Sequence, residues 1–139
     1  MHMEILQPVV AMLLLTAVVW VVLFVRRLSY MAGQKIDAEQ MQTPQQTLSL
    51  LPDDVNAPAN NFKNLFEAPV LFYVVCLCAA MLNSVDAMML NCAWGFVLLR
   101  VIHSVIHCTY NRVMHRFVAY MGSCLLLGVM LFKLALATF

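Results

Sequence analysis

Polar side chains at helical spacing lead into one of the apolar stretches of the chain. Asn60, Asn64 and Glu67 are spaced by four and three residues, with Lys63 beside them. At about 100° per residue, the first three share one stripe of a helix. Ionisable groups at membrane depth cost roughly 2.5 to 3.5 kcal/mol each on insertion scales. We therefore expect those in this stripe to be paired or functional.

A second polar stripe lies inside the next apolar stretch. Arg100, His103, His107 and Asn111 are spaced by three, four and four residues, which keeps them within roughly 60° of a helix surface. His103 and His107, one turn apart, could ligate a metal. No carboxylate or thiolate accompanies them in the usual pattern, and Arg100 would repel a cation, so we expect no metal site.

Basic residues that end or begin other helices are expected at the same depth as the two stripes. They are Arg26, Arg27 and Arg116. Positive groups, one carboxylate and two imidazoles would then meet in a polar pocket with an apolar wall, as expected of a site for an anionic hydrophilic ligand beside a lipophilic one. The alternative is that Glu67 and Arg100 form only a structural ion pair.

The elements that must position these residues are membrane spans. Of the 139 residues, 63% are hydrophobic and only 11% are charged, and the mean hydropathy is +0.84. A hydrocarbon layer of about 30 Å takes about 20 helical residues to cross. The sequence therefore predicts an all-α membrane protein, a four-helix bundle forming a single domain over residues 1–139. The expected spans are about 5–27, 60–82, 87–110 and 116–138, with a connection over about 28–59.

Two details of these elements stay open at this point. Pro69 cannot donate to the carbonyl of Leu65, so the second helix either bends beside Glu67 or begins near this proline. The connection contains Pro44, Pro52 and Pro58 in a glutamine-rich stretch. Its sequence is compatible with helix from the first span to about residue 35 and does not decide the rest.

Charge sets the expected orientation. Lys and Arg residues gather in the first and third connections, so we expect both termini to face away from the cytoplasm. Lys133 is the exception, and its side chain can reach the interface from a helix end. A formal net charge of +1 leaves no basic surface for nucleic acid. The first span lacks a basic leader and a cleavage site, so it reads as a retained anchor, and we expect a bacterial inner-membrane protein.

The two polar segments resemble those of the MAPEG family, the membrane-associated proteins in eicosanoid and glutathione metabolism. The residues that carry the likeness are Lys63-Asn64-Leu65-Phe66-Glu67 and Arg100-Val101-Ile102-His103-Ser104-Val105-Ile106-His107, with Arg116 and Tyr120 opening the last span. The nearest likeness is to the branch of microsomal prostaglandin E synthases and microsomal glutathione transferases. The resemblance implies a homotrimer that binds glutathione between neighbouring subunits near the cytoplasmic boundary.

The resemblance also implies roles for individual residues. Glutathione would contact Arg26, Arg27, Lys63, Asn64, Glu67, Arg100, His103, His107 and Tyr120. Arg116 would stabilise the thiolate, with Arg100 as the alternative. The chain departs from the branch pattern at Asn60, Lys63, His107 and Phe117, where arginine, arginine, tyrosine and a hydroxyl residue are usual; these changes count against prostaglandin synthesis itself.

Together these features predict a glutathione-dependent transferase or peroxidase that acts on lipophilic electrophiles or hydroperoxides. Glutathione carries two carboxylates that guanidinium groups can bind, and an ammonium that Glu67 could neutralise. Two alternatives remain. The chain could be a non-catalytic membrane module held together by Glu67 and Arg100, or a small transporter or lipid-binding protein that uses the polar cleft as a pathway.

Overall fold

The computed structural model describes residues 3–139, and within them it contains helices and no strand. The helices are α1 Leu6–Gln34, α2 Pro44–Leu50, α3 Asp53–Asn64, α4 Ala68–Met81, α5 Ala87–Cys108 and α6 Val113–Thr138, and a 3-10 turn, η1, covers Ala38–Met41. In this described part, four segments are long and apolar enough to cross a membrane: Leu6–Gln34, Asp53–Met81, Ala87–Cys108 and Val113–Thr138. The prediction of an all-α bundle with four spans is confirmed.

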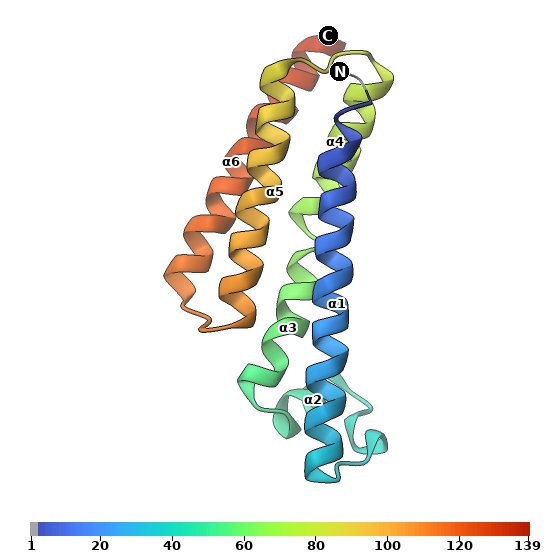
Figure 1. Ribbon diagram of the computed structural model, residues 1–139, viewed down its shortest axis with the longest axis vertical. Helices are drawn as coiled ribbons and strands as arrows, with labels where there is room; N and C mark the ends of the chain where they lie inside the picture. Colours follow the sequence, from blue (N-terminus) through green and yellow to red (C-terminus); the bar gives the residue numbers. More distant parts are fainter. Residues whose placement is uncertain (1–2) are drawn as a thin grey trace.

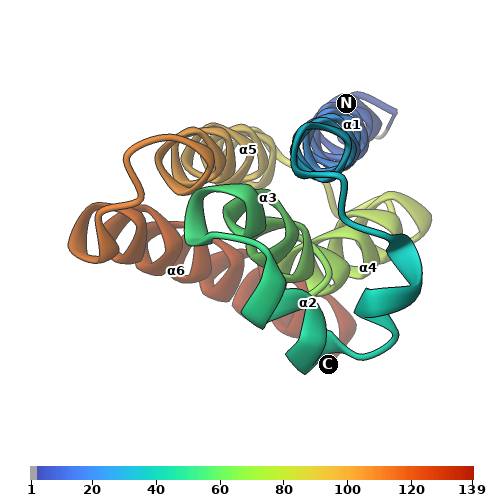
Figure 2. The same ribbon diagram turned by 90° about the horizontal axis from the view of Figure 1, so that it is seen from below.

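The long helices run side by side along one axis (Figure 1). Helix α1 packs against α3, α4 and α5, while α6 packs against α5 and α4. Seen along the axis, α3 lies against both α1 and α5 (Figure 2). Both ends of the described chain lie at one end of the bundle, and α2 lies at the other (Figure 1).

Short polar turns reverse the chain between the long helices. Asp86 caps α5 by accepting a hydrogen bond from the backbone N–H of Met89 at 2.8 Å, a common N-cap arrangement. Asn83 and Asn111 follow α4 and α5 with φ of 52° and 51°. Asparagine adopts this left-handed conformation more readily than most residues, and a residue in this conformation commonly ends a helix.

The second span is broken at the point where its polar stripe ends. Helix α3 stops at Asn64 and α4 starts at Ala68, with Pro69 in its first turn. Proline lacks the N–H that would bond to the Leu65 carbonyl in a continuous helix, and its ring would clash with that carbonyl. The two possibilities for Pro69, a bend beside Glu67 and a helix start near the proline, therefore describe one feature: the helix breaks beside Glu67 and restarts at Ala68. The prediction that Glu67 continues the helical stripe of Asn60 and Asn64 is wrong, because Glu67 lies in the break.

The connection between the first two spans is shorter and more ordered than the expected stretch 28–59. Helix α1 continues through Gln34, and α3 already begins at Asp53. Between them, the Thr43 hydroxyl oxygen at the start of α2 accepts a hydrogen bond from the Gln46 backbone N–H, and the Gln46 side-chain oxygen accepts one from the Thr43 backbone N–H. Such a capping box fixes the start of even a short helix.

Large apolar side chains cover the outside of the bundle. Leu14, Val18, Leu125 and Phe132 are each more than half exposed, although a soluble monomer seldom exposes such a surface. Inside, Phe72 of α4 stacks on Phe96 of α5 with ring centroids 4.4 Å apart. This distribution fits a bundle whose outer surface meets lipid.

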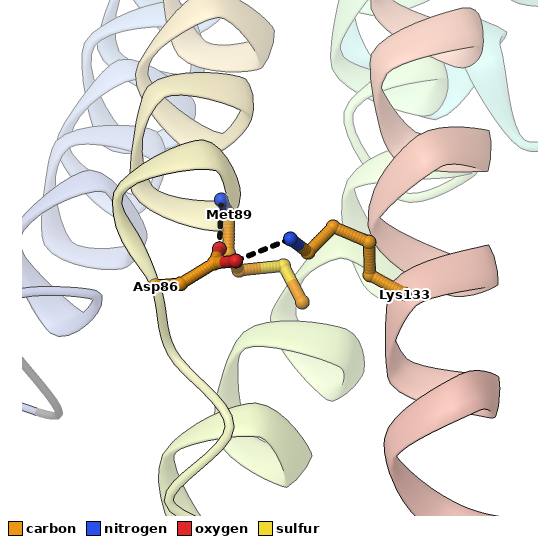
Figure 3. A network of polar contacts seen from close by, with 3 residues as sticks. All are labelled: Asp86, Met89 and Lys133. Atoms are coloured by element: carbon orange, nitrogen blue, oxygen red, sulfur yellow. Dashed lines mark hydrogen bonds and ion pairs between the residues drawn. The ribbon is translucent and has the colours of Figure 1, made fainter.

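At the end of the bundle that holds both termini, Lys133 of α6 forms an ion pair with Asp86, the residue that caps α5 (Figure 3). The sequence indicates only that the Lys133 side chain can reach the interface from a helix end and predicts no partner for it. Asp86, in the α4–α5 turn, lies beside Lys133 because α5 and α6 are antiparallel neighbours. The spacing of residues along the chain does not predict this contact.

Candidate functional site

Helix α5 buries the predicted polar stripe on the side facing its neighbours. Arg100 is 0% exposed, His103 2% and His107 3%. Their spacing places them one above another on this helix. The fourth member, Asn111, lies beyond the end of α5 at Cys108.

Arg100 is held between aromatic rings rather than by acceptors. Its guanidinium carbon is 4.5 Å from the centroid of the Tyr120 ring and 5.4 Å from that of Phe96. All three guanidinium nitrogens are buried, and none has a hydrogen-bond partner within the described chain. Contact with ring faces offsets only part of the cost of burying a charge. The site therefore has a cation that lacks an anion.

Hydrogen bonds fix the orientation of both imidazoles. His103 Nδ1 lies 2.9 Å from the backbone oxygen of Arg116, and since a carbonyl only accepts, Nδ1 is the donor. His107 Nε2 lies 3.1 Å from an Arg116 nitrogen, and since guanidinium only donates, Nε2 is the acceptor. The Nε2 atom of His103 is buried without a partner among residues 3–139, so it is available to a ligand.

Arg116 is fixed by one end of its guanidinium. The Nη1 atom donates both to His107 Nε2 and to Asn111 Oδ1, the latter at 2.6 Å. Asn111 was predicted on the α5 stripe and instead reaches the cluster from the α5–α6 turn. The remaining Arg116 nitrogens form no hydrogen bond within the described chain and can bind an anion.

A cavity of about 220 Å³ joins these groups. It lies between the end of α3, α5 and the start of α6, and its lining consists of Asn64, His103, His107, Val113, Arg116, Phe117 and Tyr120. Arg100 lies behind Tyr120, against its ring. Five of the predicted site residues thus share one cavity, and Arg100 is in contact with its wall.

Glu67 stands apart from this lining. It is exposed in the break between α3 and α4, it does not line the cavity, and it forms no ion pair with Arg100 within 4 Å in the described structure. It is still close enough to interact electrostatically with Arg100 and His103. The alternative of a direct structural ion pair between Glu67 and Arg100 is therefore not what the structure contains.

Three predicted basic residues lie elsewhere in a single chain. Arg26 donates a hydrogen bond to the backbone oxygen of Asp54 at 3.2 Å, which links α1 to α3. Arg27 and Lys63 line a second, larger cavity beside α2. Asn60 belongs to that second cavity, although Asn64, one turn along α3, lines the first.

Sequence reasoning missed a buried polar contact between α3 and α5. Ser104 donates to Asn61 Oδ1 at 3.4 Å, and Asn61 Nδ2 lies 3.6 Å from Cys108 Sγ. Asn61 is 0% exposed. The sequence feature that could have predicted this contact is an amide side chain among apolar residues of the same helix face. Asn61 lies off the stripe of Asn60 and Asn64 on which the prediction was based.

Within the described residues, no group of three or more His, Cys, Asp or Glu side chains is arranged to hold a metal ion. The ionic character of the cavity comes from the guanidinium groups of Arg116, in its lining, and of Arg100, behind the Tyr120 ring. Such groups bind anions through charge-assisted hydrogen bonds.

Comparison with known proteins gives one match. The sequence model of a family described as the MAPEG family matches residues 5–136, nearly the whole chain. The match is to the family as a whole and does not single out a branch. No curated protein and no solved structure matches the chain.

Proposed function

The chain belongs to the MAPEG family, and from this premise we propose that it is a glutathione-dependent transferase or peroxidase acting on lipophilic electrophiles or hydroperoxides. The family includes glutathione transferases and peroxidases as well as other members, so membership alone does not decide the activity. The proposal rests on the chemistry of the cavity that Arg116 lines.

The observation that carries the proposal is the buried guanidinium of Arg100, whose nitrogens have no hydrogen-bond acceptor and no ion pair among the described residues. A buried charge without a partner destabilises the folded state by several kcal/mol. An anionic ligand in the adjoining cavity would offset part of this destabilisation. The free nitrogens of Arg116 and the buried Nε2 of His103 add further polar groups. Glutathione, with two carboxylates and an ionisable thiol, fits such a set of groups.

The residues divide between binding and activation. Asn64, His103, His107 and Tyr120 would bind the peptide part of glutathione, and Arg100 would bind a carboxylate. Glu67, exposed in the α3–α4 break outside this lining, would bind the ammonium. Glutathione supplies a thiol that reacts as the thiolate. Arg116 would hold that thiolate, and lowering a thiol pKa from about 8.5 by roughly two units takes about 2.7 kcal/mol of preferential interaction.

The surroundings of the cavity suit a lipophilic second substrate. Phe117 and Val113 line it, and both are exposed on the outer surface of α6. A substrate dissolved in lipid would approach from this side and lie against a thiolate held at the polar end of the bundle. We place this end at the cytoplasmic side of a bacterial inner membrane, with both termini on the opposite side, because most basic residues flank it.

Arg26, Arg27 and Lys63 do not line this cavity in a single chain. They would reach glutathione only where a neighbouring copy brings them to it. That arrangement belongs to the homotrimer that we propose as the functional unit.

The test is calorimetric titration of glutathione into the detergent-purified protein and its Arg100→Met variant, followed by conjugation to a generic aryl halide. Methionine keeps the apolar volume and removes the buried charge, so the variant should fold at least as well without ligand. We expect glutathione to bind the wild type and to bind Arg100→Met at least tenfold more weakly, a loss of about 1.4 kcal/mol.

Arg112→Met is the matched control, because Arg112 is exposed at the start of α6 and does not line the cavity. It should titrate like the wild type. No binding to the wild type at millimolar glutathione would remove the proposal. Binding without conjugation or peroxide reduction would favour a transporter or a binding protein.

A further inference from the structure

The turn between α5 and α6 holds the backbone of Asn111 in place. Its φ of 51° is left-handed, a conformation that asparagine adopts more readily than most residues. Its backbone N–H donates to the Ile106 oxygen at 2.9 Å, which closes the end of α5. Because the backbone is held, the side-chain amide approaches Arg116 from a defined direction, and it accepts a hydrogen bond from Arg116 at 2.6 Å.

The hydrogen bonds of Arg116 occupy one of its guanidinium nitrogens completely. The Nη1 atom carries two protons and donates one to His107 Nε2 and the other to Asn111 Oδ1. The remaining N–H groups belong to Nε and Nη2, which form one edge of the planar group. Arg116 lines the cavity proposed to bind glutathione, so this edge can donate to an anion there.

Both side chains that hold Arg116 are uncharged. Asn111 presents an amide oxygen, and His107 accepts through Nε2, which an imidazolium cannot do. No carboxylate lies within 4 Å of the guanidinium among residues 3–139. A carboxylate would fix the guanidinium and also compensate its charge, whereas neutral acceptors fix it and leave the charge to stabilise another anion.

The other charged or titratable groups around this guanidinium do not supply the missing anion. Helix α5 contributes His103, and Arg100 behind the Tyr120 ring of α6. Helix α3 contributes the uncharged Asn64. Glu67, in the α3–α4 break, interacts electrostatically with Arg100 and His103 but lies outside the cavity lining. The positive charge of the free guanidinium edge is therefore left for a ligand.

We propose that Asn111 is a positioning residue for the thiolate of bound glutathione: it orients Arg116 toward the sulfur and, being neutral, leaves the guanidinium charge uncompensated. Asn111 does not line the cavity, so it acts only through Arg116, and its role rests on the proposed function. A nearby cation favours the ionised form of an acid. When the S–H bond breaks, the proton leaves to water and the electron pair stays on sulfur beside Arg116.

In Asn111→Asp, stability and reactivity should change in opposite directions. Aspartate has a similar shape, tolerates the left-handed conformation and accepts more strongly from guanidinium, so the thermal unfolding midpoint in detergent should be unchanged or higher. Its carboxylate compensates Arg116, however. The pH at which half of the bound glutathione is thiolate, followed by the ultraviolet absorbance of the thiolate, should therefore rise by about 1. At saturating glutathione, kcat/KM for an aryl halide should fall by up to about tenfold at acid pH and recover at alkaline pH.

Asn111→Gly removes the amide without adding a charge, and it also covers the case in which Asn111→Asp fails to fold. Glycine keeps the left-handed backbone, but Arg116 loses one of its two side-chain contacts and its fixed orientation. We expect kcat/KM for the aryl halide to fall about tenfold. Binding of S-methylglutathione, which has no ionisable thiol, should stay within about twofold of the wild type in both variants.

Asn83→Asp and Asn83→Gly are the matched controls, because Asn83 has the same left-handed conformation, with φ of 52°, in the turn before α5. Both should match the wild type in thiolate titration and rate. If the wild type binds and conjugates glutathione, then a wild-type thiolate titration in Asn111→Asp, a wild-type rate in Asn111→Gly or an equal shift in Asn83→Asp would each overturn the role of Asn111 alone. A loss in Asn111→Asp that persists at alkaline pH would indicate a purely structural role and overturn it too. Absence of glutathione binding to the wild type would remove both proposals.

Discussion

The guanidinium of Arg100 and that of Arg116 have opposite surroundings, although both were predicted as site residues. Arg100 has aromatic rings around it and no acceptor within the described chain. Arg116 is fixed at one nitrogen by His107 and Asn111. A group held at one end and free at the other is suited to meet a thiolate, whereas a fully buried cation is suited to compensate a bound carboxylate.

This difference leads to a prediction for Arg116→Lys. A lysine ammonium cannot contact both His107 and Asn111 in the fork geometry of guanidinium while also facing a thiolate. We expect kcat/KM for conjugation to fall by about 10- to 100-fold, or about 1.4 to 2.7 kcal/mol. The measurement is steady-state kinetics with glutathione and an aryl halide.

Arg112→Lys is the control, since it makes the same exchange four residues earlier at an exposed position outside the cavity. It should leave kcat/KM within twofold of the wild type. Equal losses in the two variants would show that Arg116 has no particular role.

The three residues that the spacing predicts on one helix face lie on an uninterrupted helix. Arg100, His103 and His107 share a face of α5 because regular spacing decides direction there. Glu67 lies in a helix break, so its direction depends on backbone angles that spacing does not provide. Arg27 and Lys63 come from different helices, and the packing of α1 against α3 brings them into a separate cavity.

Among the elements, the α4–α5 turn and α6 are joined by a pair that depends on one carboxylate. Asp86 accepts hydrogen bonds from Lys133 and from the backbone of Met89 (Figure 3). The hydrogen bond from Lys133 and then that from Met89 lower the pKa of Asp86 below its ordinary value of 3.8. The folded state therefore favours the carboxylate more than the unfolded state does.

A pH dependence follows with a defined sign. Because the pKa is lowered on folding, the stabilisation is complete above pH 3.8, the ordinary value, and is lost as the pH falls through the lowered folded value. Asp86→Asn keeps a good N-cap and removes the charge. We expect its unfolding midpoint to lie below that of the wild type at pH 7, and the difference to begin to shrink as the pH falls below about 4.

The measurement is thermal unfolding of both proteins in detergent between pH 7 and pH 3. Asp53→Asn, which removes a charge at the exposed start of α3, should show no comparable convergence. A difference between Asp86→Asn and wild type that persists unchanged at pH 3 would contradict the role of the carboxylate.

The extent of the helices was predictable only in part, for a physical reason. Hydropathy identifies residues that can lie in lipid, and it located all four spans. Helices continue beyond the hydrocarbon layer wherever caps and packing support them, as α1 does to Gln34 and α3 from Asp53. Hydropathy carries no information on those extensions, which form the walls of the larger cavity.

On the scale of the whole molecule, the glutathione cavity of one chain is small for its proposed ligand. At about 220 Å³, it falls below the roughly 300–1,000 Å³ usual for small-molecule sites. It reaches the surface at the start of α6, where Val113 and Phe117 are exposed, and Arg26 is held away from it by its contact with α3. A second copy placed against this surface would enlarge the site and add cations.

We therefore expect a homotrimer that binds glutathione only when assembled. Chemical cross-linking in membranes should give a ladder that ends at three chains, and native mass spectrometry should give the mass of three copies of the 15.7 kDa chain. Dissociation to monomers in a harsher detergent should abolish glutathione binding while helical content persists, because each chain keeps its own helix hydrogen bonds in an apolar medium. A ladder that ends at dimer would contradict the trimer, and monomers that bind glutathione as tightly as the assembly would show that one chain completes the site alone.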